Sequence, residues 1–347
     1  MKFTLSLIIS FFIGISPVLA QAGFRVMFYN VENFFDTVDD PDKDDDEFLP
    51  EGSKKWTEGR YQNKLNNIAH VITSVGEFDA PVLVGMCEIE NEKVLDDLTR
   101  QTSLKKSNYR YAITDSDDAR GIDVALLYQP DKFKRISERK HKITFPRNSK
   151  KVTRDILHVS GRVASGDTLD VFVCHFPSRR EGESESEPNR VHVASVLRAK
   201  TDSLMRTRQK AYIIIMGDFN DEPSNKSISQ TLGAKSASHN ANNKRLYNLF
   251  SKFQKQKNKG SYKYRDQWNV LDQIIVSGSL LNRDQQLGVM PETATIFQRD
   301  FLLVEDKTNG GKRPKKTYHG RRHEGGFSDH LPIYVDFFVD GYYKISK

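Results

Sequence analysis

Short polar motifs recur along the chain, and their residue types could bind a metal ion and transfer protons. They are Asn30-Val31-Glu32, Glu88, His175, Gly217-Asp218-Phe219-Asn220, Asp272 and Ser328-Asp329-His330. Several follow directly on apolar runs that are typical of buried strands. Because strand ends that meet at one edge of a sheet are where α/β proteins build sites, we expect the motifs to converge. Carboxylates, carboxamides and histidines suit a hard divalent cation and acid–base chemistry on a phosphate ester.

The turn at residues 217–220 is the sharpest local signal. There, Asp218 could orient or deprotonate a water molecule, and Asn220 could bind a charged transition state. Glycine, aspartate and asparagine also favour turns, so a plain strand-end turn explains the same residues equally well. Asp272 gains a chemical role only beside His330, since a catalytic imidazole needs an orienting acceptor. Glu88 suits Mg²⁺, although a carboxylate there also favours the start of the following helix.

Strands and helices are mixed throughout the sequence. Apolar periodicity predicts strands at residues 24–29, 82–88, 109–114, 122–128, 156–164, 168–174, 212–216, 274–276 and 333–339, and helices at 57–75, 91–101 and 189–209. Several predicted strands are adjacent along the chain, which favours an α/β fold with mixed sheets. No linker or repeat divides the chain, and the motifs run from Asn30 to His330, so we expect one domain.

The first 20 residues have the features of an export signal. Lys2 precedes an apolar stretch at residues 5–15, and small residues end at Ala20. This stretch is too short for a stable membrane span. We therefore expect a signal peptide at residues 1–20 and one domain at 21–347, exported to the periplasm or secreted, with no transmembrane segment and as a monomer.

The two cysteines each precede a motif residue. Cys87 comes before Glu88, and Cys174 before His175. Neighbouring side chains on a strand point to opposite faces, so if the motif residues face the site, the thiols face into packing. We expect two buried thiols, although a disulfide is an alternative in an exported protein.

The formal net charge is +7, which favours polyanionic partners or simply gives solubility. Basic residues cluster at 312–316 and 321–323, just before Ser328-Asp329-His330, and Arg179 and Arg180 follow His175. We expect these loops to rim the site and to bind phosphates flanking the one that is cut. A solvated charged loop explains the same runs. The residues expected to contact substrate are Arg179, Arg180, Arg321 and Arg322.

The ordered motif set resembles the endonuclease/exonuclease/phosphatase superfamily, which includes deoxyribonuclease-I-like enzymes, abasic-site endonucleases, neutral sphingomyelinases and inositol polyphosphate 5-phosphatases. Residues 272–281 and 174–178 look like the corresponding segments of pancreatic-type deoxyribonucleases. The resemblance covers essentially all of residues 21–347. It implies a four-layer α/β sandwich, in which two packed mixed β-sheets are flanked by helices.

The resemblance also implies roles for individual residues. It implies Mg²⁺ or Mn²⁺ held at Glu88, with Asn30, Glu32 and Asp329 near the metal. The implied catalytic residues are His175, Asp218, Asn220, Asp272 and His330. Asp123 is the implied orienting partner of His175.

The resulting hypothesis is an exported, divalent-metal-dependent hydrolase of phosphodiester bonds, a nuclease acting on DNA or RNA by attack of a metal-activated water. One alternative is a phospholipid or inositol-phosphate phosphoesterase of the same fold, similar to sphingomyelinase. A lipid enzyme should expose apolar residues at a loop tip, and the loop before His330 is basic and polar. Another alternative is a catalytically silent binding protein, which would have no chemical need for the complete motif set.

Overall fold

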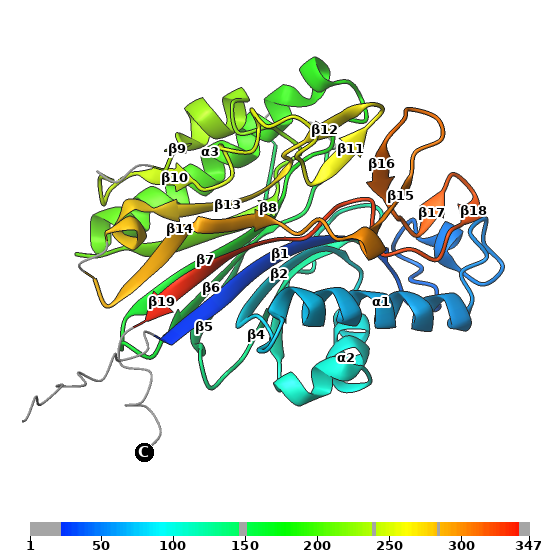
Figure 1. Cartoon of the computed structure of the whole chain (residues 1–347), viewed down its shortest axis with the longest axis horizontal. Helices are drawn as coiled ribbons and strands as arrows, with labels where there is room; N and C mark the ends of the chain where they lie inside the picture. The colour runs from blue at the N-terminus through cyan, green and yellow to red at the C-terminus, as the bar shows by residue number, and fades with distance from the viewer. Residues whose placement is uncertain (1–21, 146–150, 238–240, 283–284, 340–347) are drawn as a thin grey trace, which may run out of the picture.

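Two mixed β-sheets pack face to face (Figure 1). The computed structural model describes residues 22–145, 151–237, 241–282 and 285–339, so the signal peptide predicted at residues 1–20 lies outside the described range. The six-stranded sheet has the order β14 (Leu287–Ile296), β19 (Ile333–Val339), β1 (Ala22–Phe34), β2 (Leu83–Ile89), β4 (Asp123–Tyr128) and β3 (Arg110–Ile113). The seven-stranded sheet has the order β5 (Lys134–His141), β6 (Ile156–Arg162), β7 (Thr168–His175), β8 (Tyr212–Asp218), β13 (Asp272–Ser277), β10 (Leu246–Asn248) and β9 (Lys235–Ser236).

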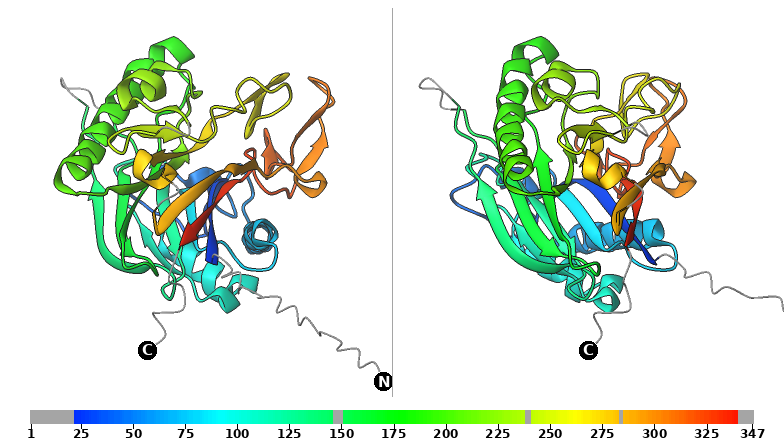
Figure 2. Two further views of the ribbon diagram at one scale, coloured as in Figure 1. Left: turned by 60° about the vertical axis from the view of Figure 1, so that its left-hand side comes forward. Right: turned by 90° about the vertical axis from the view of Figure 1, so that its left-hand side faces the viewer.

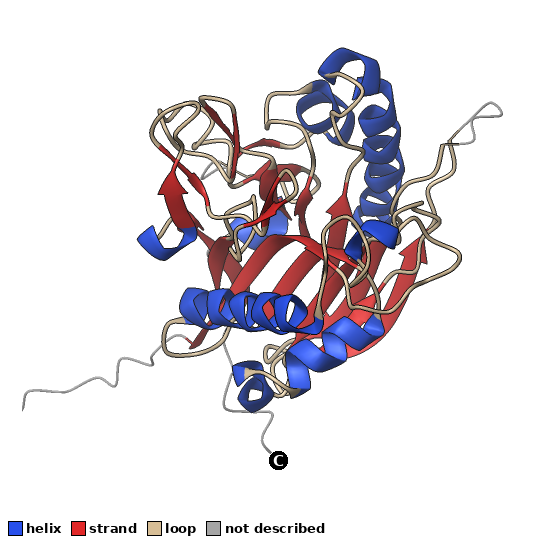
Figure 3. Ribbon diagram, turned by 90° about the vertical axis from the view of Figure 1, so that its right-hand side faces the viewer, coloured by secondary structure: helices blue, strands red, loops and turns tan. Residues whose placement is uncertain are grey.

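Both sheets combine parallel and antiparallel pairs, as the sequence predicted. The β1–β2, β7–β8 and β9–β10 pairs are parallel, and the other pairs within these two sheets are antiparallel. Helices α1 (Glu58–Gly76) and α2 (Glu92–Arg100) lie against the six-stranded sheet, and α3 (Glu183–Thr207) lies against the seven-stranded sheet (Figures 2 and 3). This arrangement confirms the predicted α/β sandwich of two mixed sheets flanked by helices.

The burial pattern of β8 explains its uninterrupted apolar sequence. Ile214 and Met216 pack into the core between the sheets, while Ile213 and Ile215 join the second cluster, beneath α3. Because alternate side chains leave a strand on opposite faces, a strand covered on both sides needs apolar residues at every position. Cys87 and Cys174 are buried and unpaired, one in each cluster, as expected from their positions beside motif residues.

Smaller elements connect the main strands and helices. They are the β11–β12 hairpin (Tyr262–Tyr264 and Gln267–Asn269), the β15–β16 ribbon (Leu303–Glu305 and Lys312–Pro314), the β17–β18 ribbon (Tyr318–His319 and Arg322–His323), a π-helix (Ser227–Leu232), and short 3-10 helices at Asp46–Phe48, Ser103–Ser107, Gly278–Leu281 and Asp300–Leu302. The three ribbons gather beyond the carboxyl ends of β1 and β2, on the right of Figure 1. Among the described residues, no helix combines the length and apolar character that crossing a bilayer requires.

The observed elements differ from the predicted ones in three places. β1 continues to Phe34, so Asn30 and Glu32 lie within the strand and not after it. α3 begins at Glu183, six residues before the predicted start at 189, and contains Pro188. The extra turn is held by side chains, because Arg190 donates a hydrogen bond to the Glu183 carbonyl (2.9 Å). The third difference is that β5, β14 and the short strands β9 to β12 and β15 to β18 were not predicted at all.

Candidate functional site

Strand register alone brings several predicted site residues together. His175 on β7 lies opposite Asp218 on β8, and Asp218 lies opposite Asp272 on β13. The other sheet meets them at the same end, because Asn30 on β1 donates a hydrogen bond from Nδ2 to Oδ2 of Asp218 (3.1 Å). The carboxyl ends of β7 and β8, the amino end of the antiparallel β13 and the Asn30 position of β1 therefore form one site, as expected where strand ends line up at one edge of an α/β sheet.

The Oδ2 atom of Asp218 is the centre of this site. Besides Asn30, two imidazoles face it, with Nε2 of His175 at 3.6 Å and Nε2 of His330 at 3.8 Å. Its other oxygen accepts the N–H of Asn220 at 2.9 Å, which fixes the carboxylate. Burial raises the pKa of Asp218, and the charge of His330 only partly opposes that increase. The carboxylate is thus a better proton acceptor near neutral pH than an exposed aspartate.

His330 is oriented from both sides. Its Nδ1 lies 2.6 Å from Oδ2 of Asp272, and its backbone N–H donates to Ser328 Oγ at 3.0 Å. That hydroxyl in turn donates to the Asn30 carbonyl at 2.7 Å. Burial alone would lower the pKa of His330, but the carboxylates of Asp272 and Asp218 outweigh it, and the net pKa is well above the ordinary value. His330 is therefore held as a cation with Nε2–H available to the site.

His175 has the opposite electrostatic environment. Burial lowers its pKa well below the ordinary value, and the positive charges of Arg154 and Arg120 lower it further. Arg154 is buried at the end of β7, where its Nη2 donates a hydrogen bond to the carbonyl of Phe176 (2.7 Å). His175 is therefore neutral beside a cationic His330. A pair of titratable groups with pKa values moved in opposite directions is a common basis for separate acid and base roles.

Two predicted metal ligands, Glu88 and Glu32, lie at the edge of this cluster. Glu88 is 14% exposed; its Oε1 is 4.0 Å from Nε2 of His175, and its Oε2 accepts the N–H of Asn33 at 2.8 Å. Glu32 Oε2 accepts the N–H of Thr317 at 2.6 Å and lies 4.0 Å from Nζ of Lys64. Glu32 and Glu88 both adopt positive φ angles, of 54° and 64°. Such strained backbone persists where surrounding structure enforces it, as it commonly does at functional sites.

The donor set fits a hard divalent cation. Burial and the negative charge of Asp329 together raise the pKa of Glu32, so these carboxyl groups repel one another in the absence of a counter-ion. The lysine beneath them, Lys64, is buried and hydrogen-bonded to Thr317 and to the Phe327 carbonyl. Oxygen ligands from a few carboxylates and an amide are what Mg²⁺ and Mn²⁺ prefer.

A second group of potential ligand atoms lies nearby. Among the described residues, ligand atoms of Asp218, Asp272 and His330 are within 4.8 Å of one another. The short Asp272–His330 contact already uses the Nδ1 atom of the imidazole. This group therefore fits proton handling, whereas Glu88, with Asn30, Glu32 and Asp329, fits the cation.

Other predicted site residues do not join this cluster. The carboxylate of Asp123 accepts hydrogen bonds from Thr114 Oγ1 (2.5 Å) and from the Ser116 N–H (3.1 and 3.2 Å). Among the described contacts, none joins it to His175. The remaining basic candidates are exposed side chains without a described contact to the cluster: Arg180, Arg321 and Arg322.

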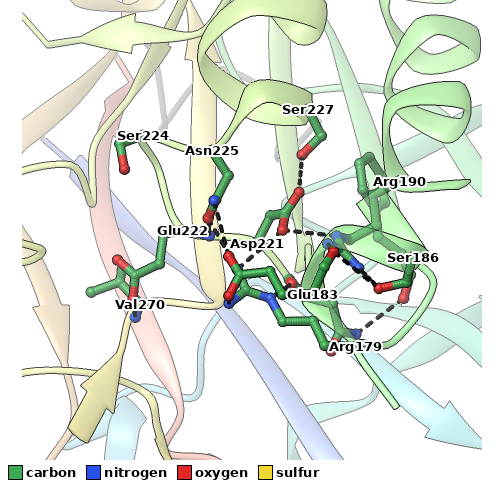
Figure 4. Close-up of polar contacts among 12 residues, drawn as sticks. Arg179, Glu183, Ser186, Arg190, Asp221, Glu222, Ser224, Asn225, Ser227 and Val270 are labelled. Atoms are coloured by element: carbon green, nitrogen blue, oxygen red, sulfur yellow. Dashed lines mark hydrogen bonds and ion pairs between the residues drawn. The ribbon is translucent and has the colours of Figure 1, made fainter. Parts of the chain in front are cut away.

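The Arg179 side chain points toward Asp221 and Asn225 (Figure 4). Its Nε donates to the Asn220 carbonyl at 2.6 Å, and Nη2 donates to Asp221 and Asn225, both at 3.0 Å. The buried Arg190 binds the same Asp221 carboxylate at 2.7 Å. Together these contacts clamp the turn after Asp218, in which Asn220 has a φ of 49° and donates Nδ2 to the Phe176 carbonyl at 3.0 Å.

Sequence analysis did not identify Lys64, Arg154 or Tyr262 as site residues. Lys64 could have been noticed in the sequence, because a charged residue lies on the apolar face of α1, between Tyr61 and Leu65. Arg154 and Tyr262 lie in segments without a strong pattern. Tyr262 reaches the site because its ring packs 4.7 Å from the ring of His330.

Comparisons with solved structures show the same fold. An endonuclease/exonuclease/phosphatase family protein from Bacteroides thetaiotaomicron is 17% identical, with a TM-score of 0.56 over 92% of this chain and 96% of that chain. The human Nocturnin catalytic domain, solved with a bound sulfate anion, is 16% identical, with a TM-score of 0.54 over 91% and 94%. TDP2 from D. rerio, complexed with single strand DNA product, is 15% identical, with a TM-score of 0.53 over 91% and 99%.

A family model gives evidence from the sequence itself. A comparison with curated proteins gives no match. The model of the Endonuclease/Exonuclease/phosphatase family matches residues 25–338, which include every motif residue of the site. This chain therefore belongs to the endonuclease/exonuclease/phosphatase family.

Proposed function

We propose that this protein is a phosphodiester hydrolase whose substrate is nucleic acid. The observation that carries the proposal is the convergence of Asn30, His175 and His330 on Oδ2 of Asp218, with the Glu88 carboxylate alongside. Structures of the same fold were solved with a sulfate anion and with a single strand DNA product, which supports an anionic substrate.

The proposed chemistry is a single displacement by water at phosphorus. Asp218 accepts a proton from the attacking water as the new O–P bond forms, and the raised pKa of its carboxyl suits that role. His330, held as a cation by Asp272, donates Nε2–H to the phosphate oxygens as charge develops on them. The bond from phosphorus to the leaving oxygen breaks, that oxygen takes a proton from solvent, and Asp218 returns to solvent the proton that it accepted. Neutral His175 would donate a hydrogen bond from its N–H to a phosphate oxygen.

A divalent cation, Mg²⁺ or Mn²⁺, is part of this proposal. Glu88 would hold it, together with Asn30, Glu32 and Asp329. When bound, it would supply positive charge that neutralises the phosphate and the repulsion among these carboxyl groups. We also propose that the protein is exported, on the basis of the signal-like residues 1–20. A monomeric state remains a prediction.

A substrate panel tests the function directly. Purified protein would be assayed with Mg²⁺ or Mn²⁺ on plasmid DNA, RNA, sphingomyelin, an inositol polyphosphate and a generic phosphodiester. We expect hydrolysis of DNA or RNA, and loss of at least ~100-fold in turnover in Asp218→Asn, the usual scale for a lost acid–base group. Selective hydrolysis of sphingomyelin or the inositol polyphosphate would overturn the nuclease assignment, and no hydrolysis of any substrate would overturn the enzymatic one.

A further inference from the structure

The β11–β12 hairpin stands directly beside the catalytic cluster. It is a regular antiparallel pair in which Tyr262 lies opposite Asn269 and Tyr264 lies opposite Gln267. Tyr262 also forms a β-bridge with His330, so the base of the hairpin is part of the site. The hairpin leads into β13, whose first residue is Asp272. In Figure 1 it projects next to the β15–β16 ribbon.

Two tyrosines share one face of this hairpin. Because side chains alternate along a strand, Tyr262 and Tyr264 point the same way and are separated by roughly 7 Å of strand. The Tyr262 ring packs on the ring of His330, with centroids 4.7 Å apart. Tyr264 is 58% exposed, which makes it one of the few large hydrophobic residues on the described surface with that much exposure. The face thus runs from the reacting centre to an uncovered aromatic ring.

The exposed ring stands on a firmly anchored support. From the opposite face, the largely buried side chain of Lys263 donates to Asp306 Oδ2 (3.0 Å) and to the Gly310 carbonyl (2.6 Å). Ser261, just before β11, accepts the N–H of Leu331 at its carbonyl (2.7 Å). These contacts hold the hairpin in place, so binding a ligand on Tyr264 would not require ordering a mobile loop.

A cation accompanies the exposed ring. The guanidinium of Arg265 lies 5.3 Å from the centroid of Tyr264. Arg265 begins the two-residue turn of the hairpin with a φ of 55°, a conformation that favours glycine. A guanidinium on one face leaves the other face of the ring available, and it also places positive charge beside it.

We propose that this hairpin is a base-stacking platform, in which Tyr264 stacks on an unpaired nucleobase next to the phosphodiester that reaches His330, while Arg265 contacts the adjoining phosphate. The proposal rests on the proposed function and narrows its substrate to nucleic acid with exposed bases, because a base inside a duplex has no free face. The headgroups of phospholipids and inositol phosphates have no aromatic face to stack.

Binding experiments can separate bases from phosphates. In an Asp218→Asn background with Mg²⁺, binding of a labelled single-stranded oligonucleotide would be compared with binding of an abasic oligomer of equal length, which has the same phosphates and no bases. We expect Tyr264→Ala to weaken binding of the oligonucleotide by about tenfold, within the usual range for one base–aromatic contact, and to change abasic binding less than about twofold. Tyr264→Trp should retain the base-dependent difference.

Phe78 offers a matched control. It is a fully exposed aromatic residue in the turn between α1 and β2, at the end of β2 remote from Glu88. Phe78→Ala should leave both affinities unchanged. Equal weakening of both ligands by Tyr264→Ala, or no weakening, would overturn the platform. Because the assay needs no turnover, base-dependent binding without hydrolysis in the wild-type protein would refute the proposed function and leave the platform standing.

Discussion

Replacing Asp272 by asparagine tests whether the catalytic power of His330 depends on its buried partner. The contact is short, with 2.6 Å between Nδ1 and Oδ2, and both side chains are buried. Hydrogen bonds to charged groups contribute about 1.5–3 kcal/mol. If the variant loses about 2 kcal/mol of transition-state stabilisation with this hydrogen bond, turnover falls by roughly 30-fold, since 1.36 kcal/mol corresponds to a tenfold change in rate. His330→Ala should cost at least ~100-fold, because the donor itself is gone.

The pH dependence should change in a defined direction. The carboxylates raise the pKa of His330, so the protonated form required for donation is lost only as the pH rises through that high value. In Asp272→Asn, one of the two principal carboxylates is gone, while burial still lowers the pKa. The alkaline limb of the pH–kcat profile should therefore move to lower pH in the variant. An unchanged alkaline limb would mean that His330 is not the group whose proton is required.

Two further measurements test whether Asp272 and His330 act together in catalysis. If the pair acts as a unit, the double variant of Asp272 and His330 should be no slower than His330→Ala, whereas independent residues would multiply to roughly 3,000-fold. The buried His158–Asp170 pair, with Nε2 and Oδ1 2.9 Å apart on the other side of the sheet, is the matched control. Asp170→Asn should lower thermal stability and leave turnover of the folded protein unchanged. Equal loss of turnover in both asparagine variants would refute the catalytic reading of Asp272.

Other expectations follow from the same contacts. Excess chelator should abolish activity, and Mg²⁺ or Mn²⁺ should restore it; full activity in chelator would contradict the metal site. Glu88→Gln should raise the metal concentration needed for the half-maximal rate, because an amide is a poor ligand for a hard cation. Arg179→Lys should lower kcat with little change in KM, because it loosens the Asn220 turn, whereas a substrate-binding arginine would mainly raise KM. Burial would raise the pKa of Asp306, but hydrogen bonds from Lys263 and the backbone outweigh it and lower that pKa. The difference in unfolding free energy between wild type and Asp306→Asn should therefore be constant above about pH 5 and shrink as the pH falls below the unfolded pKa of about 3.9, as denaturant titrations would show.

The parts of the fold that sequence predicted are those with burial on both faces. β8 reads as an apolar run because it lies between two packed layers. β5 gave no such signal, since it is an edge strand with mostly exposed, charged residues. β14 was hidden for a different reason. It contains Pro291 and a shift in its register with β19 between Met290 and Thr295, and proline in a strand is confined to such irregular or edge positions.

The same distinction applies to the site. Motif residues at strand ends could be grouped from sequence because parallel register aligns those ends, as it does for His175 and Asp218. Residues delivered by loops could not, since their positions depend on tertiary packing. Arg179 illustrates the difference. An arginine after a motif histidine looks like a phosphate ligand, yet its described hydrogen bonds all go to protein oxygens around Asp221.

Protonation states were the part least accessible to sequence, although they decide the chemistry. His175 and His330 are the same residue type and approach the same oxygen of Asp218, at 3.6 and 3.8 Å. Burial lowers both pKa values. Arg154, near His175, lowers the pKa of that residue further, whereas Asp272, in contact with His330, helps to raise the pKa of His330 above its ordinary value. Both partners are more than 20 residues away in sequence and arrive only through the fold. Two residues of one type thus acquire different roles from their neighbours, so reversing the charge of Arg154 should alter the protonation of His175 while every motif residue stays intact.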